Sequence, residues 1–112
     1  LRLAALESDA VSYNAAIAAC SGGGAWQAGM AMFAAMLRSS HTPDAITFVS
    51  AMGCCEDGAQ WQLSLDLLRS MKPMRHKPTV ICYNAAISAC RAGGAWQSAV
   101  LLLDEMHGRW IF

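Results

Sequence analysis

Hydrophobic residues return along this chain at intervals of three and four, which is the spacing of one face of an α-helix rather than of a β-strand. The first such stripe consists of Tyr13, Ala16, Ile17 and Cys20, and it is repeated from Phe48 to Cys55 and from Tyr83 to Cys90. A second stripe follows each time and starts at a tryptophan; its members are Trp26, Met30, Phe33 and Leu37, then Trp61, Leu65 and Leu68, then Trp96, Val100 and Leu103. The pattern predicts pairs of helices that each bury one face, tryptophans included, in a core.

Glycines and prolines separate these stripes. Between the first and second stripes stand Gly22 to Gly24, Asp57 with Gly58, and Gly93 with Gly94. A helix C-cap needs a left-handed residue at this point, which glycine adopts without strain. Pro43 and Pro78 follow the second stripes and cannot continue a helix. Each segment is therefore predicted as a helix, a tight turn, a second helix and a short link.

The whole pattern repeats with a period of 35 residues. The step relates Tyr13, Phe48 and Tyr83, then Cys20, Cys55 and Cys90, the three tryptophans, the glutamine after each of them, Met36, Met71 and Met106, and the two prolines. One helical hairpin cannot bury both of its faces, so consecutive hairpins must stack to form a continuous core. The sequence therefore predicts an all-α solenoid of antiparallel helical hairpins.

The period also sets the expected units. We place the first unit at residues 10–44, the second at 45–79 and a third, truncated at its C-terminal end, at 80–112, with residues 1–9 as the tail of a preceding unit. Apolar residues stand at both ends where a solenoid needs polar caps; they are Leu1, Leu3, Trp110, Ile111 and Phe112. We therefore expect these units to belong to a longer array.

Composition limits the classes of function. The chain of 112 residues is 55% hydrophobic and 14% charged, and its eight basic residues balance eight acidic ones. It has no bulk positive field that would hold polyanions without specificity, so a nucleic-acid site has to be local. No apolar run approaches the length of a membrane span. The five cysteines lack C-x-x-C spacing, which favours reduced thiols over a disulfide framework.

No catalytic or metal-binding constellation is visible. His41, His76 and His107 fall late in their units, away from any nucleophile or carboxylate set. The periodic cysteines have no neighbouring ligands at metal spacing. The glycines at 22–24 lack the Lys-Ser/Thr of a phosphate-binding loop. We therefore expect no enzymatic activity, no metal, no cofactor and no small-molecule substrate.

The repeated strings resemble a known family. The 35-residue unit opens with V-S-Y-N-A-A-I (11–17) or I-C-Y-N-A-A-I (81–87), continues through G-G-A-W-Q, and closes with Pro-Asp or Pro-Thr. This pattern, over almost the whole chain, resembles the pentatricopeptide repeat. Tetratricopeptide repeats have a 34-residue step and a W-x-x-L-G-x-x-Y pattern that is absent here. The resemblance implies a right-handed superhelical solenoid that binds single-stranded RNA at about one base per unit. It also implies a role in mitochondria or plastids, in RNA processing, editing, stability or translation.

The resemblance further implies which residues read RNA. A base is met by an early residue of the first helix together with the last residue of the same unit. The candidates are Asn14 with Asp44, Val49 with Thr79, Asn84 without a partner in this chain, and Asp9 closing the preceding unit. An Asn–Asp pair implies a preference for uracil, whereas Val49 in place of an amide implies weak or absent readout. Val11, Ile46 and Ile81 precede Asn14, Val49 and Asn84 by three residues, and the resemblance implies that they sandwich the bases.

Other interpretations of these residues stay open at this point. Asp9, Asp44 and Thr79 stand before helices and can act as N-caps alone. Asn14 and Asn84 can be solvated surface residues, and the aliphatic row can be packing between units. The basic cluster of Arg69, Lys72, Arg75 and Lys77 fits a solvated link or contacts with phosphates. An alternative for the whole chain is a protein-binding solenoid, which the neutral charge and Val49 favour.

Overall fold

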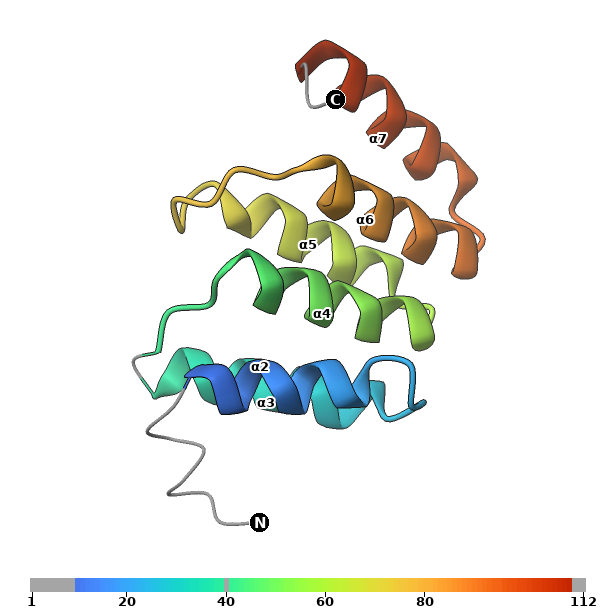
Figure 1. The fold of residues 1–112 in the computed structure, drawn as a ribbon. Coiled ribbons are helices and arrows are strands. Elements are labelled where there is room, and N and C mark those ends of the chain that lie inside the picture. Colours follow the sequence, from blue (N-terminus) through green and yellow to red (C-terminus); the bar gives the residue numbers. More distant parts are fainter. Residues whose placement is uncertain (1–9, 40, 110–112) are drawn as a thin grey trace.

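The computed structural model describes residues 10–39 and 41–109. In this part of the chain all regular structure is helical, and six helices form three antiparallel hairpins (Figure 1). The hairpins are α2 (Ala10–Cys20) with α3 (Trp26–Arg38), α4 (Ala45–Asp57) with α5 (Trp61–Met71), and α6 (Val80–Ala92) with α7 (Trp96–Arg109). The first helices begin 35 residues apart, as the sequence period requires. The prediction of an all-α solenoid of helical hairpins is confirmed.

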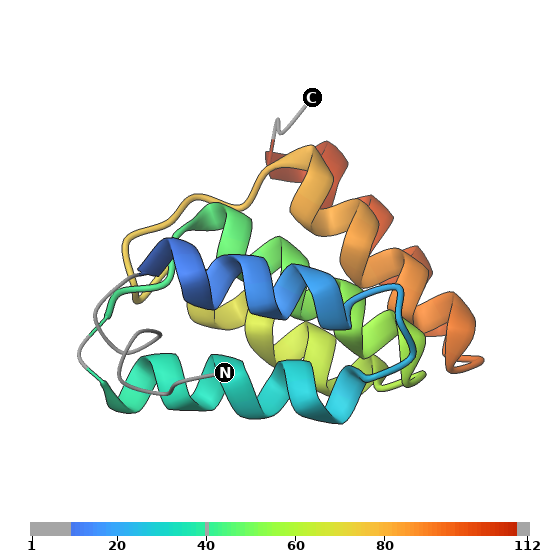
Figure 2. The ribbon, with the colours of Figure 1, turned by 60° about the horizontal axis from the view of Figure 1, so that its bottom comes forward.

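The hairpins stack in chain order. The first helices of the units, α2, α4 and α6, pack on one another, and each also packs on the second helix of its own unit. The second helices α3 and α5 in addition pack against the first helix of the following unit. Figure 2 shows the first hairpin in front with the later ones behind it. The described chain is elongated, with extents of 43 × 28 × 19 Å.

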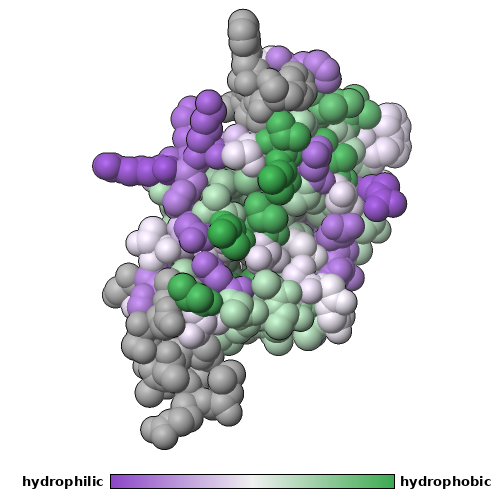
Figure 3. Space-filling model, viewed as in Figure 1, coloured by the Kyte–Doolittle hydropathy of each residue, from purple (hydrophilic) through white to green (hydrophobic). Residues whose placement is uncertain are grey.

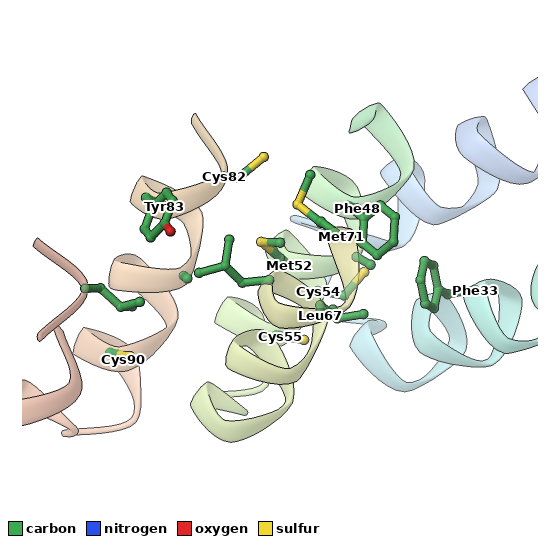
Figure 4. Close-up of a cluster of buried hydrophobic side chains, with 14 of the residues drawn as sticks. Phe33, Phe48, Met52, Cys54, Cys55, Leu67, Met71, Cys82, Tyr83 and Cys90 are labelled. Atoms are coloured by element: carbon green, nitrogen blue, oxygen red, sulfur yellow. The ribbon is translucent and has the colours of Figure 1, made fainter. Parts of the chain in front are cut away.

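The first stripe of each unit forms the core. Ile17, Phe48, Met52, Cys55, Tyr83 and Cys90 are buried there. Phe33 of α3 meets Phe48 of the next unit edge-on, with ring centroids 5.6 Å apart. Figure 4 shows how side chains from successive units meet in this layer. Burial of large apolar groups across the junctions forms a main core that spans the three hairpins, while Tyr13 and Met36 form a smaller cluster of their own.

The cysteines lie in or beside this core and all five are free. Cys54 and Cys82, which break the 35-residue period, are fully buried. Burial raises the pKa of the Cys54 thiol to about 11 and that of Cys55 to about 12, with smaller contributions from neighbouring cysteines. These two thiols therefore stay protonated at neutral pH and serve as small apolar side chains.

The predicted burial of the second stripe is wrong for α7 and also for Leu37 of α3, which is 45% exposed. Trp96, Val100 and Leu103 are exposed, with 67% of Trp96 open to solvent, and α7 buries Leu102 and Met106 instead. The reason is that the stripe of a second helix turns toward the following unit. A Cβ atom added to Gly58 lies 2.4 Å from the ring of Trp26, and one added to Gly93 lies 2.5 Å from the ring of Trp61. No following unit is part of the described chain, so Trp96 lacks this contact.

The turns also differ from the sequence prediction at one place. Gly24 and Gly94 have φ values of +79° and +73°, but in the second unit the left-handed residue is Ala59, at +54°, and not Gly58, at −93°. Gly58 is needed for another reason, because the ring of Trp26 lies where a side chain would project. In this turn Gly58 makes room for the Trp26 ring, and Ala59 adopts the unfavourable left-handed backbone conformation.

Two further expectations concern the ends and the membrane. The expected tail of a preceding unit, residues 1–9 with Asp9, and the apolar residues 110–112 lie outside the described residues. None of the described helices combines the length and the apolar character that a bilayer crossing requires.

Candidate nucleic-acid interface

A row of exposed aliphatic side chains lies in the first turns of the first helices. Val11 of α2, Ile46 of α4 and Ile81 of α6 are 72%, 65% and 64% exposed. Figure 3 shows hydrophobic side chains gathered in a band that crosses the stacked helices. Because about two thirds of each of the three side chains is open to solvent, packing between the units leaves them available to a ligand.

An open groove separates two members of this row. It has a volume of about 330 Å³ and lies between α4 and α6. Its lining consists of Ala45, Ile46, Val49, Ser50, Thr79, Ile81 and Cys82. The structure therefore brings Val49 and Thr79 of the second unit together with both neighbouring aliphatic residues. A flat apolar group is held in such a groove by hydrophobic contact, with little polar selection.

The first unit has a polar pair at the equivalent place. The Nδ2 atom of Asn14 in α2 donates to Oδ1 of Asp44, 30 residues later, at 3.5 Å. The Oδ1 atom of Asn14 contacts the hydroxyl of Thr47 in α4. Asn14 is half-buried and Asp44 is exposed. The two residues that the resemblance pairs are thus neighbours, although one comes from the start and the other from the end of the unit.

Asp44 is also the N-cap of α4. Its Oδ1 accepts the backbone N–H of Thr47 at 2.9 Å, and its own N–H donates to the Thr47 hydroxyl at 3.1 Å, which completes a capping box. Burial raises the pKa of Asp44, but hydrogen bonds from Thr47 and Ile46 and the electrostatic interaction with His76 outweigh it, so the net pKa is lowered. The carboxylate is therefore ionised at neutral pH and acts only as an acceptor. Capping and pairing with Asn14 occur together.

The remaining candidates do not form a second polar pair. Thr79 caps α6 by accepting the N–H of Cys82 at 3.4 Å, and it is exposed beside half-buried Val49. Asn84 is exposed on α6, and its partner position falls after the end of this chain. Asp9 lies outside the described residues. Within the described chain, then, a complete polar pair is found at the first unit.

The basic cluster follows the end of α5. Lys72, Arg75 and Lys77 line a second groove of about 370 Å³ together with His76 and Pro78. Arg69 is held by Glu105 of α7 at 2.5 Å and so bridges two helices. His76 meets the carbonyl oxygen of Pro43 at 2.7 Å and packs edge-on against the ring of Phe48. These contacts anchor the link between the second and third units.

The structure shows two polar residues that the sequence analysis missed. Thr47 is fully buried and joins the capping box to Asn14. Asp57, at the end of α4, accepts the backbone N–H of Gly22 at 2.5 Å and so ties together the turns of two consecutive units. The spacing Asp44-x-x-Thr47 was a signal for the first of these, because a side chain three residues after an N-cap reaches back to it. The second contact has no local signal. Elsewhere in the described chain, no three His, Cys, Asp or Glu residues gather as metal ligands would.

Comparison with known proteins places the chain in a family. The PPR repeat model matches residues 11–41 and 81–111, which together make up more than half of the sequence. The chain belongs to the pentatricopeptide repeat family. The two matched segments flank the second pentatricopeptide unit, which has the same hairpin in the structure.

Solved pentatricopeptide repeat structures share the fold. One is PPR10 in complex with an 18-nt PSAJ RNA element, and another is PPR10 from maize. Each is 25% identical to this chain with a TM-score of 0.83, over 93% of this chain and 15% of the PPR10 chain. This chain thus spans a small part of the length of those proteins. The search of curated proteins found no match.

Proposed function

We propose that this pentatricopeptide stack binds single-stranded RNA, one base per unit, and that Asn14 with Asp44 selects the base at the first unit. The observation that carries the proposal is the 3.5 Å contact of Asn14 with Asp44 beside the exposed side chains of Val11 and Ile46. An amide and a carboxylate offer donors and acceptors to the edge of a base, while aliphatic side chains cover its faces. The RNA complex of the similar protein PPR10 supports this choice of ligand.

The second unit contributes affinity with little selection. Its groove, with Ile46, Val49 and Ile81 in the wall, is mostly apolar and offers Thr79 as the polar group near the edge. Contacts of this stacking kind are worth roughly 1–3 kcal/mol per base. Two bases therefore give at most about 6 kcal/mol, which corresponds to a dissociation constant of tens of micromolar at best. We expect weak binding by this chain alone and uracil as the preferred base at the first unit.

The cellular role proposed here rests on the family alone. A member of this family fits RNA processing, editing, stability or translation in a mitochondrion or plastid. We propose no catalytic step for these residues.

A protein-binding scaffold is the second candidate function. The apolar groove between α4 and α6, together with the balanced charge of the chain, favours it. In that case Asn14 would hold the backbone of a partner peptide. The hydrogen bond of Asn14 to the Asp44 carboxylate opposes it, since a clamp on a peptide backbone needs the amide alone and no charged group beside it.

The two candidates can be separated by titrating the chain with uridine, cytidine and adenosine hexanucleotides. Homopolymers present the same base to every unit, so the register of the RNA does not matter. We expect NMR signals of the Asn14 side-chain amide and the Val49 methyl groups to shift with all three RNAs, and the uridine RNA to bind about fivefold more tightly, the worth of one hydrogen bond of about 1 kcal/mol. Exchange of the pair, by Asn14→Asp with Asp44→Asn, should change this order.

The matched control is Val49→Ala, which alters the equivalent place of the second unit and should leave the order of the bases intact. Equal affinity for all three RNAs before and after the exchange, while a protein partner still binds, would overturn the RNA function in favour of the scaffold.

A further inference from the structure

We propose that Thr47 is a positioning residue, which sets the orientation of the Asn14 amide and thereby the choice of base at the first unit. The inference deepens the proposed RNA function and rests on it. Thr47 belongs to the following unit, so base selection by one unit depends on a side chain of the next.

The hydrogen bonds around Thr47 leave one arrangement of the amide. Asp44 is ionised, so an Asn14 oxygen turned toward it would put two acceptors 3.5 Å apart with no proton between them. The Nδ2 atom of Asn14 therefore faces Asp44. The oxygen of the amide then faces the hydroxyl of Thr47 at close range, which requires a proton between these two oxygens.

In the part of the chain that the structure describes, Thr47 is the residue that supplies this proton. Its hydroxyl has a single hydrogen, and Asp44 Oδ1 lies at 2.9 Å as a second acceptor for it. Asp44 Oδ1 already receives the backbone N–H of Thr47 and the amide of Asn14, whereas within residues 10–39 and 41–109 the donor found for the Asn14 oxygen is Thr47. The Thr47 hydroxyl accepts the N–H of Asp44 in turn, at 3.1 Å. The three residues thus form a closed ring in which each donates to the next.

This ring determines what Asn14 offers to a base. One hydrogen of its Nδ2 is used by Asp44 and its oxygen is directed at Thr47, so the second Nδ2 hydrogen is left as the donor of the amide. Thr47 is fully buried and held at both its hydroxyl and its backbone N–H, so it cannot move away to let the amide turn. A fixed donor discriminates between bases better than an amide that turns freely, because no ordering is needed on binding.

The next junction of the chain supports the coupling. The residue 35 positions after Thr47 is Cys82, and the residue 35 positions after Asn14 is Val49. Where the amide is missing, the hydroxyl is missing as well. Cys82 is buried like Thr47, but its sulfur is met by the hydroxyl of Thr79 at 3.5 Å, the cap of its own helix. A small buried residue is thus sufficient for the fold at this place, and the hydroxyl accompanies the amide.

The test removes the hydroxyl and keeps the shape, by Thr47→Val in the 112-residue chain. The readout is the ratio of affinities for the uridine and cytidine hexanucleotides, measured by NMR titration at a temperature where circular dichroism shows the variant to be folded. We expect this ratio to fall from about fivefold to near one, and the free protein to show a shifted side-chain amide signal of Asn14. Thr47→Ser, which keeps the hydroxyl, should restore both. Loss of the cap alone would weaken binding of every RNA equally and leave the ratio unchanged.

Two more variants complete the design. Cys90→Ala changes a buried side chain of α6 that does not line the groove, and it should leave the ratio at its original value. If Thr47→Val does not fold, Thr47→Cys introduces the residue found at the next junction and should lower the ratio in the same way, because a thiol is a weak donor. An unchanged ratio in a folded Thr47 variant overturns the role of Thr47. If Asn14→Ala also leaves the ratio unchanged, the base selection proposed for Asn14 fails as well. If Asn14→Ala lowers the ratio while the Thr47 variant does not, base selection by Asn14 stands and only the role of Thr47 fails.

Discussion

Asp44 joins two consecutive units through one carboxylate. It caps α4 through the N–H of Thr47 and receives the amide of Asn14 from α2. Because Asp44 caps α4 and, in the proposed function, also contacts the base, any Asp44 variant is expected to change binding and stability together. Asn14, which is not part of the capping box, is therefore the better place to separate the two effects.

At the residue scale, Ala59→Gly should stabilise the protein. Ala59 has a φ of +54°, at the place where the other two units have glycine. The left-handed conformation costs a residue with a Cβ about 1–2 kcal/mol, and glycine offsets part of this gain with about 0.4–1 kcal/mol of extra chain entropy in the unfolded state. We expect a net increase of roughly 0.5–1 kcal/mol in the free energy of unfolding, measured with urea.

The matched control is Ala31→Gly, at an exposed site within α3, where the backbone is helical. It should lower the stability by about 1 kcal/mol. If Ala59→Gly lowered the free energy of unfolding as Ala31→Gly does, the backbone conformation of Ala59 would not be strained.

At the scale of elements, the helices dock through a tryptophan of one unit and a glycine of the next. Trp26 lies against Gly58 and Trp61 against Gly93, at the ends of α4 and α6. A bulky ring against a residue without a side chain lets a helix of one unit approach the turn of the following unit closely. Of the tryptophans that recur every 35 residues, Trp26 and Trp61 therefore contact the glycine of the following unit and do not fill the core of their own hairpin.

Gly58→Ala should therefore weaken the junction of the first two units. Its new Cβ would lie 2.4 Å from the ring of Trp26, while the φ of −93° suits alanine, so collision is the cause of any loss. We expect a loss of about 1–3 kcal/mol, seen as a lower midpoint of thermal unfolding by circular dichroism.

Gly108→Ala is a suitable comparison because, among the residues that the structure describes, none lies within 4 Å of its added Cβ in α7. It should be neutral or slightly stabilising. A Gly58→Ala protein as stable as the original would mean that the Trp26 ring moves aside at no cost.

At the scale of the whole molecule, α7 presents the tryptophan stripe that the other units use for docking. Trp96, Val100 and Leu103 are exposed on it. In a solenoid the stability is a sum of the intrinsic terms of the units and of the interfaces between neighbours. An added unit that covers this stripe should therefore raise the stability of the units before it.

The added unit can be a copy of residues 45–79, fused after Phe112 through a link that keeps the 35-residue step. We expect this fusion to be more stable than the original chain. Covering the three exposed side chains should add on the order of 2–5 kcal/mol to the free energy of unfolding, measured by urea titration. The same copy with leucine in place of its equivalent of Gly58 would collide with Trp96 and should give little of this gain. Equal midpoints for both fusions would argue against docking of this kind.

Much of the fold could be predicted because its signals are local and repeated. The stripe from Tyr13 to Cys20 and its two repeats indicate helices by spacing alone, and the period predicts stacking. The prediction was wrong where a residue depends on its neighbour in the next unit. Gly58 was taken as a turn residue because its contact with Trp26 lies 32 positions away in sequence. Trp96 was taken as buried because helical spacing does not show that its stripe faces the following unit.

For the site, the sequence by itself determined which side chains return to the same wall of the stack, since helical spacing and a fixed period decide this before any contact forms. The tertiary structure decided which of them meet: that Asn14 reaches Asp44, that Thr47 lies between them, and that Val11, Ile46 and Ile81 stay open to solvent. The physical reason is that these contacts join residues about one unit apart. They exist only once the hairpins have packed, and the packing is governed by the volumes of buried side chains rather than by the pattern along the chain.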